Sequence, residues 1–223
     1  MISVDSFQNL AILENLYRLQ TLGYTYTDPI TQNIQNSSTA LPDTLMSLRQ
    51  AIDKCYLCDL SKSRSKSMMG YGNPKAKLMF IDAYVSAAED EEAQYYVGRS
   101  GMMLRDMIEK VLLLNTDDVY FTHAVKCKPF GFQTPSESEC GSCSPFLLKQ
   151  LELIKPNVIV TLGPDAYRLL TSDTSDFERL MGEIIPFGDA VIIPLYHPLF
   201  LVRNPSLKKD AMRDLQTIKA QLS

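Results

Sequence analysis

Four short apolar segments constrain the fold of this 223-residue chain more than any other feature. They are Leu78-Met-Phe-Ile81, Val119-Tyr-Phe-Thr122, Val158-Ile-Val-Thr-Leu162 and Val191-Ile-Ile-Pro-Leu195. Each is continuous, and β-branched and aromatic residues are frequent in them, which is typical of strands buried on both faces. We therefore expect four strands at the centre of the molecule.

Helical patterns follow or separate these strands, at about residues 102–114, 136–154, 165–171 and 205–222. Strands and helices that alternate in this way predict an α/β fold, with a parallel sheet covered by helices on both sides. In such sheets ligands bind where the strands reach their carboxyl ends. That edge would hold residues 82–90, 123–127, 163 and 196–203.

The N-terminal part has a different composition. Apolar side chains recur at helical spacing over residues 5–22, and residues 25–42 are rich in Thr, Asn, Ser and Gln. The first pattern predicts an amphipathic helix and the second a polar linker. We expect residues 1–44 to form this extension and residues 45–223 to form one domain, whose first helix leads to Cys55.

Net charge and hydropathy exclude some classes of protein. The chain has no apolar run long enough to span a bilayer and no basic-then-apolar leader, so we expect a cytoplasmic protein with no membrane partner. The net charge of −4 argues against a general coat of positive charge but leaves room for a local basic strip.

Cysteines are the first chemical signal. Cys55 and Cys58 have the spacing at which one turn of backbone offers two thiolates to one metal, and Cys127 and Cys143 flank a segment that passes through Pro129, Gly131 and Pro135. Four cysteines fit a structural zinc ion or an iron–sulfur cluster, and spacing does not separate the two. The alternatives are a redox pair and ordinary buried thiols. Cys140, the fifth cysteine, would be left over after these four.

Several motifs together resemble a known family. They are the cysteine spacing, Tyr96-Val-Gly-Arg-Ser-Gly101, Lys155-Pro-Asn-Val-Ile-Val-Thr-Leu-Gly163 and Tyr196-His-Pro-Leu-Phe-Leu-Val-Arg-Asn-Pro205. From about Leu45 to the C-terminus the chain resembles the family 4 uracil-DNA glycosylases, the iron–sulfur members of the uracil-DNA glycosylase superfamily. The resemblance implies a three-layer α/β/α sandwich on a four-stranded parallel sheet. It also implies a 4Fe-4S cluster, remote from the reaction centre, held by Cys55, Cys58, Cys127 and Cys143.

The activity that this resemblance implies is base excision repair. The enzyme would flip a deaminated base, uracil or a related lesion, out of single- or double-stranded DNA and hydrolyse its N-glycosidic bond, acting as a monomer. Bond cleavage leaves a cationic sugar and an anionic base, so the site needs negative or water-positioning groups near the sugar and donors near the base.

Matching positions give the expected roles. His197 stands where the family serves the charge on the departing base, and Glu89 where a carboxylate takes part in hydrolysis. Leu201 matches the residue that wedges into the duplex. The expected DNA-contacting residues are Arg99, Phe200, Leu201 and Arg203.

The first motif departs from the family. Residues 82–86 replace a Gly-Glu-Gly/Ala-Pro-Gly sequence, so the motif glutamate is missing and Asp82 is the candidate substitute. His123 replaces an Asn that reads the pyrimidine edge, and Tyr96 replaces an aromatic residue that stacks on the base. The expected base-binding residues are Ala83, Tyr84, Tyr96 and His123.

Two main hypotheses remain from the sequence. The first is an active DNA glycosylase with an altered base preference. The second is a catalytically silent iron–sulfur homologue that binds nucleic acid. A third, a zinc or redox α/β protein unrelated to DNA, would require all the ordered matches to arise by chance.

Overall fold

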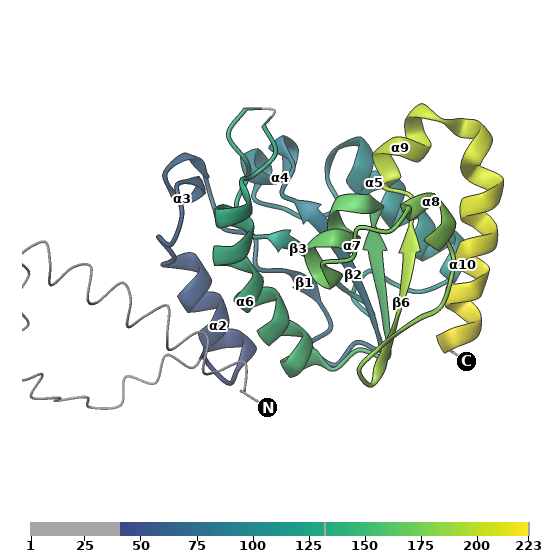
Figure 1. The fold of residues 1–223 in the computed structure, drawn as a ribbon, viewed down its shortest axis with the longest axis horizontal. Coiled ribbons are helices and arrows are strands. Elements are labelled where there is room, and N and C mark those ends of the chain that lie inside the picture. Colours follow the sequence, from purple (N-terminus) through teal and green to yellow (C-terminus); the bar gives the residue numbers. More distant parts are fainter. Residues whose placement is uncertain (1–40, 132, 223) are drawn as a thin grey trace, which may run out of the picture. The chain divides into compact units, whose positions relative to one another are not determined.

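The computed structural model describes residues 41–131 and 133–222 (Figure 1). The predicted N-terminal helix and most of its linker lie outside the described residues. The strands are β1 (Tyr71–Gly72), β2 (Leu78–Tyr84), β3 (Tyr120–Val125), β4 (Val158–Leu162), β5 (Ile185–Phe187) and β6 (Ala190–Leu195). The helices are α2 (Leu45–Asp53), α3 (Leu60–Ser63), α4 (Ala87–Glu92), α5 (Gly98–Asp106), η1 (Met107–Leu112), α6 (Glu137–Ile154), α7 (Gly163–Thr171), α8 (Phe177–Leu180), α9 (Pro198–Arg203), η2 (Pro205–Leu207) and α10 (Lys208–Leu222).

The strands form one sheet in the order β1-β3-β2-β4-β6-β5. The central four, β3, β2, β4 and β6, are parallel and coincide with the four predicted segments, which confirms the expected class of fold. The predicted count was too low, because β1 and β5 add antiparallel edges within the described chain. These strands have two and three residues, too short to show a periodic pattern.

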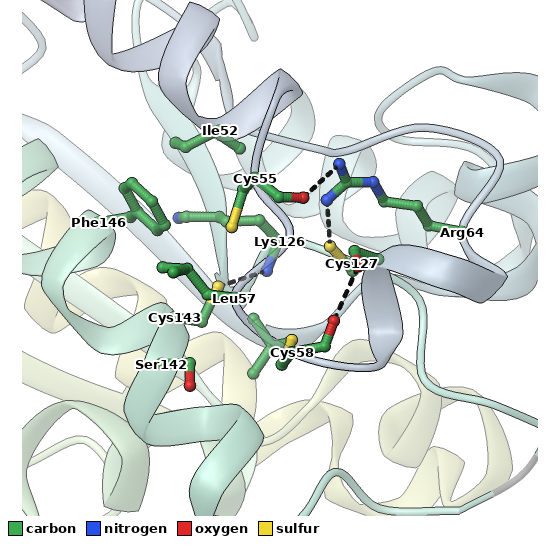
Figure 2. A pocket seen from close by; sticks show the side chains of 12 residues that line it. Ile52, Cys55, Leu57, Cys58, Arg64, Lys126, Cys127, Ser142, Cys143 and Phe146 are labelled. Carbon is green, nitrogen blue, oxygen red and sulfur yellow. Dashed lines mark hydrogen bonds between the residues drawn. The ribbon is translucent and has the colours of Figure 1, made fainter.

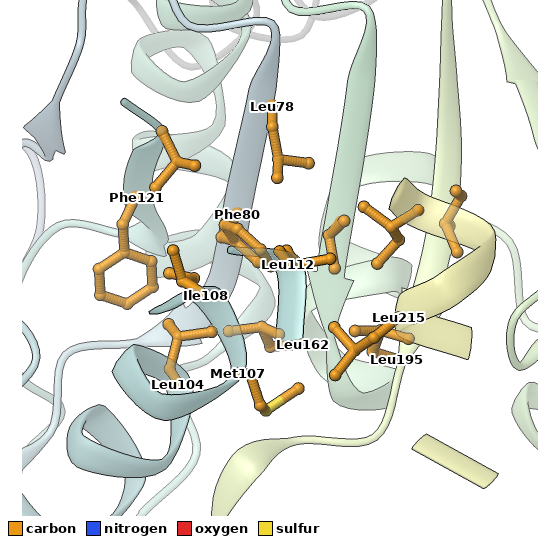
Figure 3. Close-up of a cluster of buried hydrophobic side chains, with 14 of the residues drawn as sticks. Leu78, Phe80, Leu104, Met107, Ile108, Leu112, Phe121, Leu162, Leu195 and Leu215 are labelled. Carbon is orange, nitrogen blue, oxygen red and sulfur yellow. The ribbon is translucent and has the colours of Figure 1, made fainter. Parts of the chain in front are cut away.

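Helices cover both faces of the sheet, as predicted (Figure 1). Along β2, Leu78 and Phe80 point into one core and Met79 and Ile81 into the other, because successive side chains of a strand alternate between faces. The first core also takes side chains from α5, η1 and α10 (Figure 3), and the second from α6 and α7. Burial on both faces is why these strands read as continuous apolar runs.

Two segments differ from the sequence prediction. The predicted helix over residues 102–114 begins earlier, as α5, and continues as the π-helical η1. The segment after β6 contains a short helix, α9, which the helical patterns in the sequence did not predict and which His197 caps. No helix among the described residues is long and apolar enough to cross a membrane.

Candidate active site

A cavity of about 610 Å³ lies at the carboxyl ends of β2 and β4, beside the start of α9. This is the edge at which the sequence places the candidate chemistry. Its lining includes Asp82, Ala83, Tyr84, Ser86, Glu89, Ser100, Phe121, Lys128, Gln133, Gly163, Asp165, His197 and Leu199. The volume is in the range of sites that enclose a small organic group.

Asp82 and His197 form a hydrogen-bonded pair in this cavity. The Nδ1 atom of His197 accepts the backbone N–H of Leu199 at 3.1 Å, so the proton of a neutral ring sits on Nε2. Nε2 then donates to Oδ2 of Asp82 at 3.2 Å. The other carboxylate oxygen, Oδ1, accepts the backbone N–H of Ala83 at 2.7 Å. Asp82 therefore lines the cavity and contacts His197, and its role as the substitute for the missing glutamate stays a prediction.

Gly163 leaves room for the histidine of this pair. Asp82 lies on β2 and His197 follows β6, with β4 between them, so the two side chains must meet across roughly 9–10 Å of sheet. Gly163 stands at the end of β4 with φ of +84°, and a Cβ there would lie 3.1 Å from the Cβ of His197. A side chain at this position would crowd the histidine.

The pairing also shifts the pKa values of both side chains. Burial alone would raise the pKa of Asp82, but His197, together with His123 and the backbone N–H of Ala83, outweighs burial and lowers it. Burial alone would lower the pKa of His197, but Asp82 outweighs burial and raises it. The site therefore carries an ionised carboxylate at neutral pH.

Glu89 is held by a capping box at the start of α4. The Ser86 side chain accepts the backbone N–H of Glu89, and Glu89 Oε2 accepts the backbone N–H of Ser86 at 3.0 Å. The same oxygen lies 3.1 Å from Nε2 of His123. The Ser-x-x-Glu pattern of residues 86–89 is a recognisable helix-start signal that the sequence analysis did not use.

The four expected base-binding residues do not all reach the cavity. Ala83 and Tyr84 line it, whereas Tyr96 and His123 are buried and are not among the residues that line it. Tyr96 has a left-handed backbone (φ 60°) and packs against Phe121, with ring centroids 5.2 Å apart. Phe121 itself is among the residues that line the cavity.

Of the expected DNA-contacting residues, some are exposed and one is buried. Arg99 on α5 and Arg203 on α9 are exposed, and Phe200 is 45% exposed and stacks on Tyr196 at 5.4 Å. Leu201 is only 1% exposed and belongs to the first core, which does not fit a residue that enters DNA. The reason is helical: α9 turns Leu201 inward and leaves Phe200 outside.

The four predicted metal ligands line a second, separate hollow (Figure 2). Cys55 and Cys58 follow α2, Cys127 follows β3, and Cys143 lies on α6. Cys140 is half-buried and does not line this hollow. Among the described residues, no group of three or more His, Cys, Asp or Glu stands in the arrangement of a single-ion site.

Two N–H donors serve the sulfurs of this hollow. Arg64 donates to the sulfur of Cys127 at 2.9 Å and to the carbonyl of Cys55 at 2.9 Å, and the backbone N–H of Lys126 donates to the sulfur of Cys143 at 3.2 Å. Burial raises the pKa of the Cys143 thiol to about 11. Donors aimed at sulfur stabilise thiolates that bind a metal, which fits an all-cysteine centre.

Asp90 connects the cysteine hollow to the cavity. It follows Glu89 on α4 and accepts hydrogen bonds from both the backbone N–H and the hydroxyl of Ser65, each at 2.9 Å. Its carboxylate also lies 3.6 Å from the ammonium of Lys128, the residue after Cys127. Glu89 is the catalytic candidate of this acidic pair, and Asp90 ties the two sites together.

The fold and the cavity together define a class. A parallel α/β/α sandwich with a histidine–carboxylate pair and a second carboxylate at its strand ends has the architecture and groups of an α/β DNA glycosylase. The family model described as "Uracil DNA glycosylase superfamily" matches residues 69–217, and the chain belongs to this superfamily.

Individual relatives indicate which members of the superfamily the chain resembles. The type-4 uracil-DNA glycosylase of Sulfurisphaera tokodaii is 32% identical over 185 residues, which cover 79% of this chain and 84% of the relative. That of Saccharolobus solfataricus is 32% identical over 189 residues, covering 81% and 88%. That of Thermotoga maritima is 31% identical over 175 residues, covering 77% and 91%. The chain is thus similar to type-4 enzymes over most of their length.

Proposed function

We propose that this protein excises a deaminated base, uracil or a related lesion, from DNA by hydrolysing the N-glycosidic bond. The observation that carries the proposal is the convergence of Asp82, His197 and Glu89 on one cavity at the strand ends. The similarity to enzymes named type-4 uracil-DNA glycosylases supports it.

Each of the three groups suits one part of the reaction. A base flipped into the cavity gains negative charge as the bond breaks, and the Nε2–H of His197 can turn from Asp82 to a carbonyl oxygen of that base. The Asp82 carboxylate then faces the positive charge of the sugar. Glu89 supplies a second carboxylate that can orient the attacking water.

The surface around the cavity supplies contacts to the DNA strand. Arg99 and Arg203 are exposed on neighbouring helices and can bind phosphates. Phe200, exposed and backed by Tyr196, takes the role expected of Leu201, which is to fill the gap left by the flipped base.

We also propose that Cys55, Cys58, Cys127 and Cys143 bind a 4Fe-4S cluster. Four thiolates and no histidine fit such a cluster, and the resemblance to the iron–sulfur family 4 glycosylases favours it over zinc. When bound, the cluster would supply a rigid crosslink between α2, β3 and α6 rather than a reacting group.

An excision assay tests the activity. Single- and double-stranded oligonucleotides that contain uracil, hypoxanthine or xanthine are incubated with the protein, and abasic sites are then cleaved with alkali. We expect strand scission that falls about 10²- to 10⁴-fold in His197→Ala and in Asp82→Asn. Gel-shift binding without scission of any substrate would instead support the silent nucleic-acid-binding homologue.

A further inference from the structure

His123 lies near the carboxyl end of β3 and is not among the residues that line the cavity. It is opposite Asp82 in the β2–β3 register and is 0% exposed. Its ring is stacked on Tyr95, with centroids 6.1 Å apart, and meets Phe121 edge-on at 4.9 Å. The aromatic neighbours fix the plane of the imidazole, and Phe121 rather than His123 borders the cavity.

Neither ring nitrogen of His123 is placed to read a base. Nε2 is engaged with Oε2 of Glu89 at 3.1 Å. Nδ1 is buried, has no hydrogen-bond partner among the described residues, and belongs to a residue that does not line the cavity. A flipped base would therefore find no donor or acceptor from His123.

Glu89 receives all its hydrogen bonds on one oxygen. Oε2 accepts the Ser86 backbone N–H at 3.0 Å and the Ser86 hydroxyl at 2.8 Å, and it also contacts Nε2 of His123. Oε1 has no partner within the described part of the chain, and Glu89 lines the cavity. The arrangement fixes the carboxylate plane and leaves Oε1 for a water molecule.

We propose that His123 serves Glu89 rather than the base: it is a positioning residue that holds the carboxylate so that Oε1 orders the attacking water. This inference rests on the proposed function. Burial alone would raise the pKa of Glu89, but His123 and Ser86 outweigh burial and lower it, which keeps the carboxylate ionised. The chain thus has two histidine–carboxylate pairs, with the His197 pair facing the base and the His123 pair facing the water.

The first test needs no catalytic activity. The chain has only two histidines, so a protein labelled with ¹⁵N-histidine gives two imidazole signal sets, which His197→Ala assigns. We expect Glu89→Gln to shift the ring nitrogens of His123 and leave those of His197 nearly unchanged, with the reverse in Asp82→Asn. If the His123 ring does not respond to Glu89→Gln, the pair does not exist in solution and the inference is wrong.

The second test separates positioning from base reading. His123→Phe keeps an aromatic ring for Tyr95 and Phe121 but removes the N–H donor to Glu89, whereas His123→Gln keeps a donor. Single-turnover excision is measured against pH for both variants. In His123→Phe we expect an excision rate about 10- to 100-fold lower at pH 7. The acidic limb of the pH–rate profile should move to higher pH, and KM should stay within about threefold of wild type. His123→Gln should recover part of the rate.

Two outcomes would overturn the inference. One is a changed preference among uracil, hypoxanthine and xanthine in His123→Phe with an unmoved acidic limb, because that identifies a base reader. The other is His123→Gln being as slow as His123→Phe while both remain folded. If wild-type protein excises nothing, the proposed function fails, but the imidazole spectra still decide whether His123 and Glu89 are paired.

Discussion

The cysteine hollow and the cavity at the strand ends are built on opposite principles. In the hollow, Arg64 and the backbone of Lys126 already donate to sulfur or to nearby carbonyls, and Cys127 and Cys143 are buried. In the cavity, Oε1 of Glu89 is unpaired within the described chain and the side chain of His197 remains 30% exposed. The difference shows which region holds the structure and which one is left able to react.

The largest effect should come from removing a ligand in the hollow. We expect Cys127→Ser to lose iron and sulfide and to lower the free energy of unfolding by about 4 kcal/mol, because the cluster binds only the folded chain. Anaerobic metal analysis and denaturant unfolding measure this. Cys140→Ser is the control, with iron retained and stability within about 0.5 kcal/mol of wild type, because Cys140 does not line the hollow. Iron loss from the control alone would assign the ligands differently.

Asp90 tests whether the two regions are separable. Asp90→Asn removes the charge that accepts both hydrogen bonds from Ser65, so we expect the free energy of unfolding to fall by about 2–3 kcal/mol. Iron retention and excision should both decline, because Asp90 connects the segment after Cys58 to the helix of Glu89. Glu91→Gln, exposed on the same helix, should stay within about 0.5 kcal/mol. Loss of excision with full iron content would show that the coupling runs only through α4.

Gly163 tests the cavity alone. Gly163→Ala places a Cβ 3.1 Å from that of His197 at a positive φ, so we expect a loss of about 1–2 kcal/mol in unfolding free energy. The excision rate should fall by more than this loss of stability would cause, and the iron content should stay unchanged. Gly141→Ala in α6 is the matched control, because a Cβ there meets nothing within 4 Å and a helix interior favours alanine. It should leave the protein as stable or stabilise it by up to about 1 kcal/mol.

The smallest expected effect is the pH dependence of the Asp82–His197 pair. The lowered pKa of Asp82 gives stability that is present above its usual value of 3.8 and is lost as pH falls through the folded pKa. The raised pKa of His197 gives stability that is present below its usual value of 6.5 and is lost as pH rises through the folded pKa. The stability difference between wild type and Asp82→Asn, about 1 kcal/mol, should therefore be largest between these values. A difference that is flat from pH 3 to 9 would contradict the pairing.

Strand positions were predictable because burial on both faces imposes a local signature. All four predicted segments lie at the central strands, and Val158–Leu162 coincides with β4 over its whole length. The edge strands β1 and β5 were not predictable, because so few residues carry no periodic signal. The short helix α9 was missed for a similar reason, and with it the burial of Leu201.

The sequence predicted the positions of the site residues along the chain but not the directions in which their side chains point. Asp82, Glu89 and His197 do meet in the cavity, whereas Tyr96 and His123 are turned into the interior. Matching a motif places a residue along a strand or loop, but a left-handed φ at Tyr96 or a carboxylate beside His123 decides where the side chain points. The carboxylate beside His123 comes from Glu89, a residue distant in sequence from the motif that it affects.

The amino-acid sequence by itself determined the parallel α/β class, the edge at which the chemistry gathers and the four cysteines, because hydrophobic periodicity and residue type are local properties. Only the tertiary structure decided that His197 reaches Asp82 past Gly163 and that His123 faces Glu89. Hydrogen bonds between side chains depend on distances of a few ångströms across neighbouring strands, and those distances are set by how the whole sheet packs.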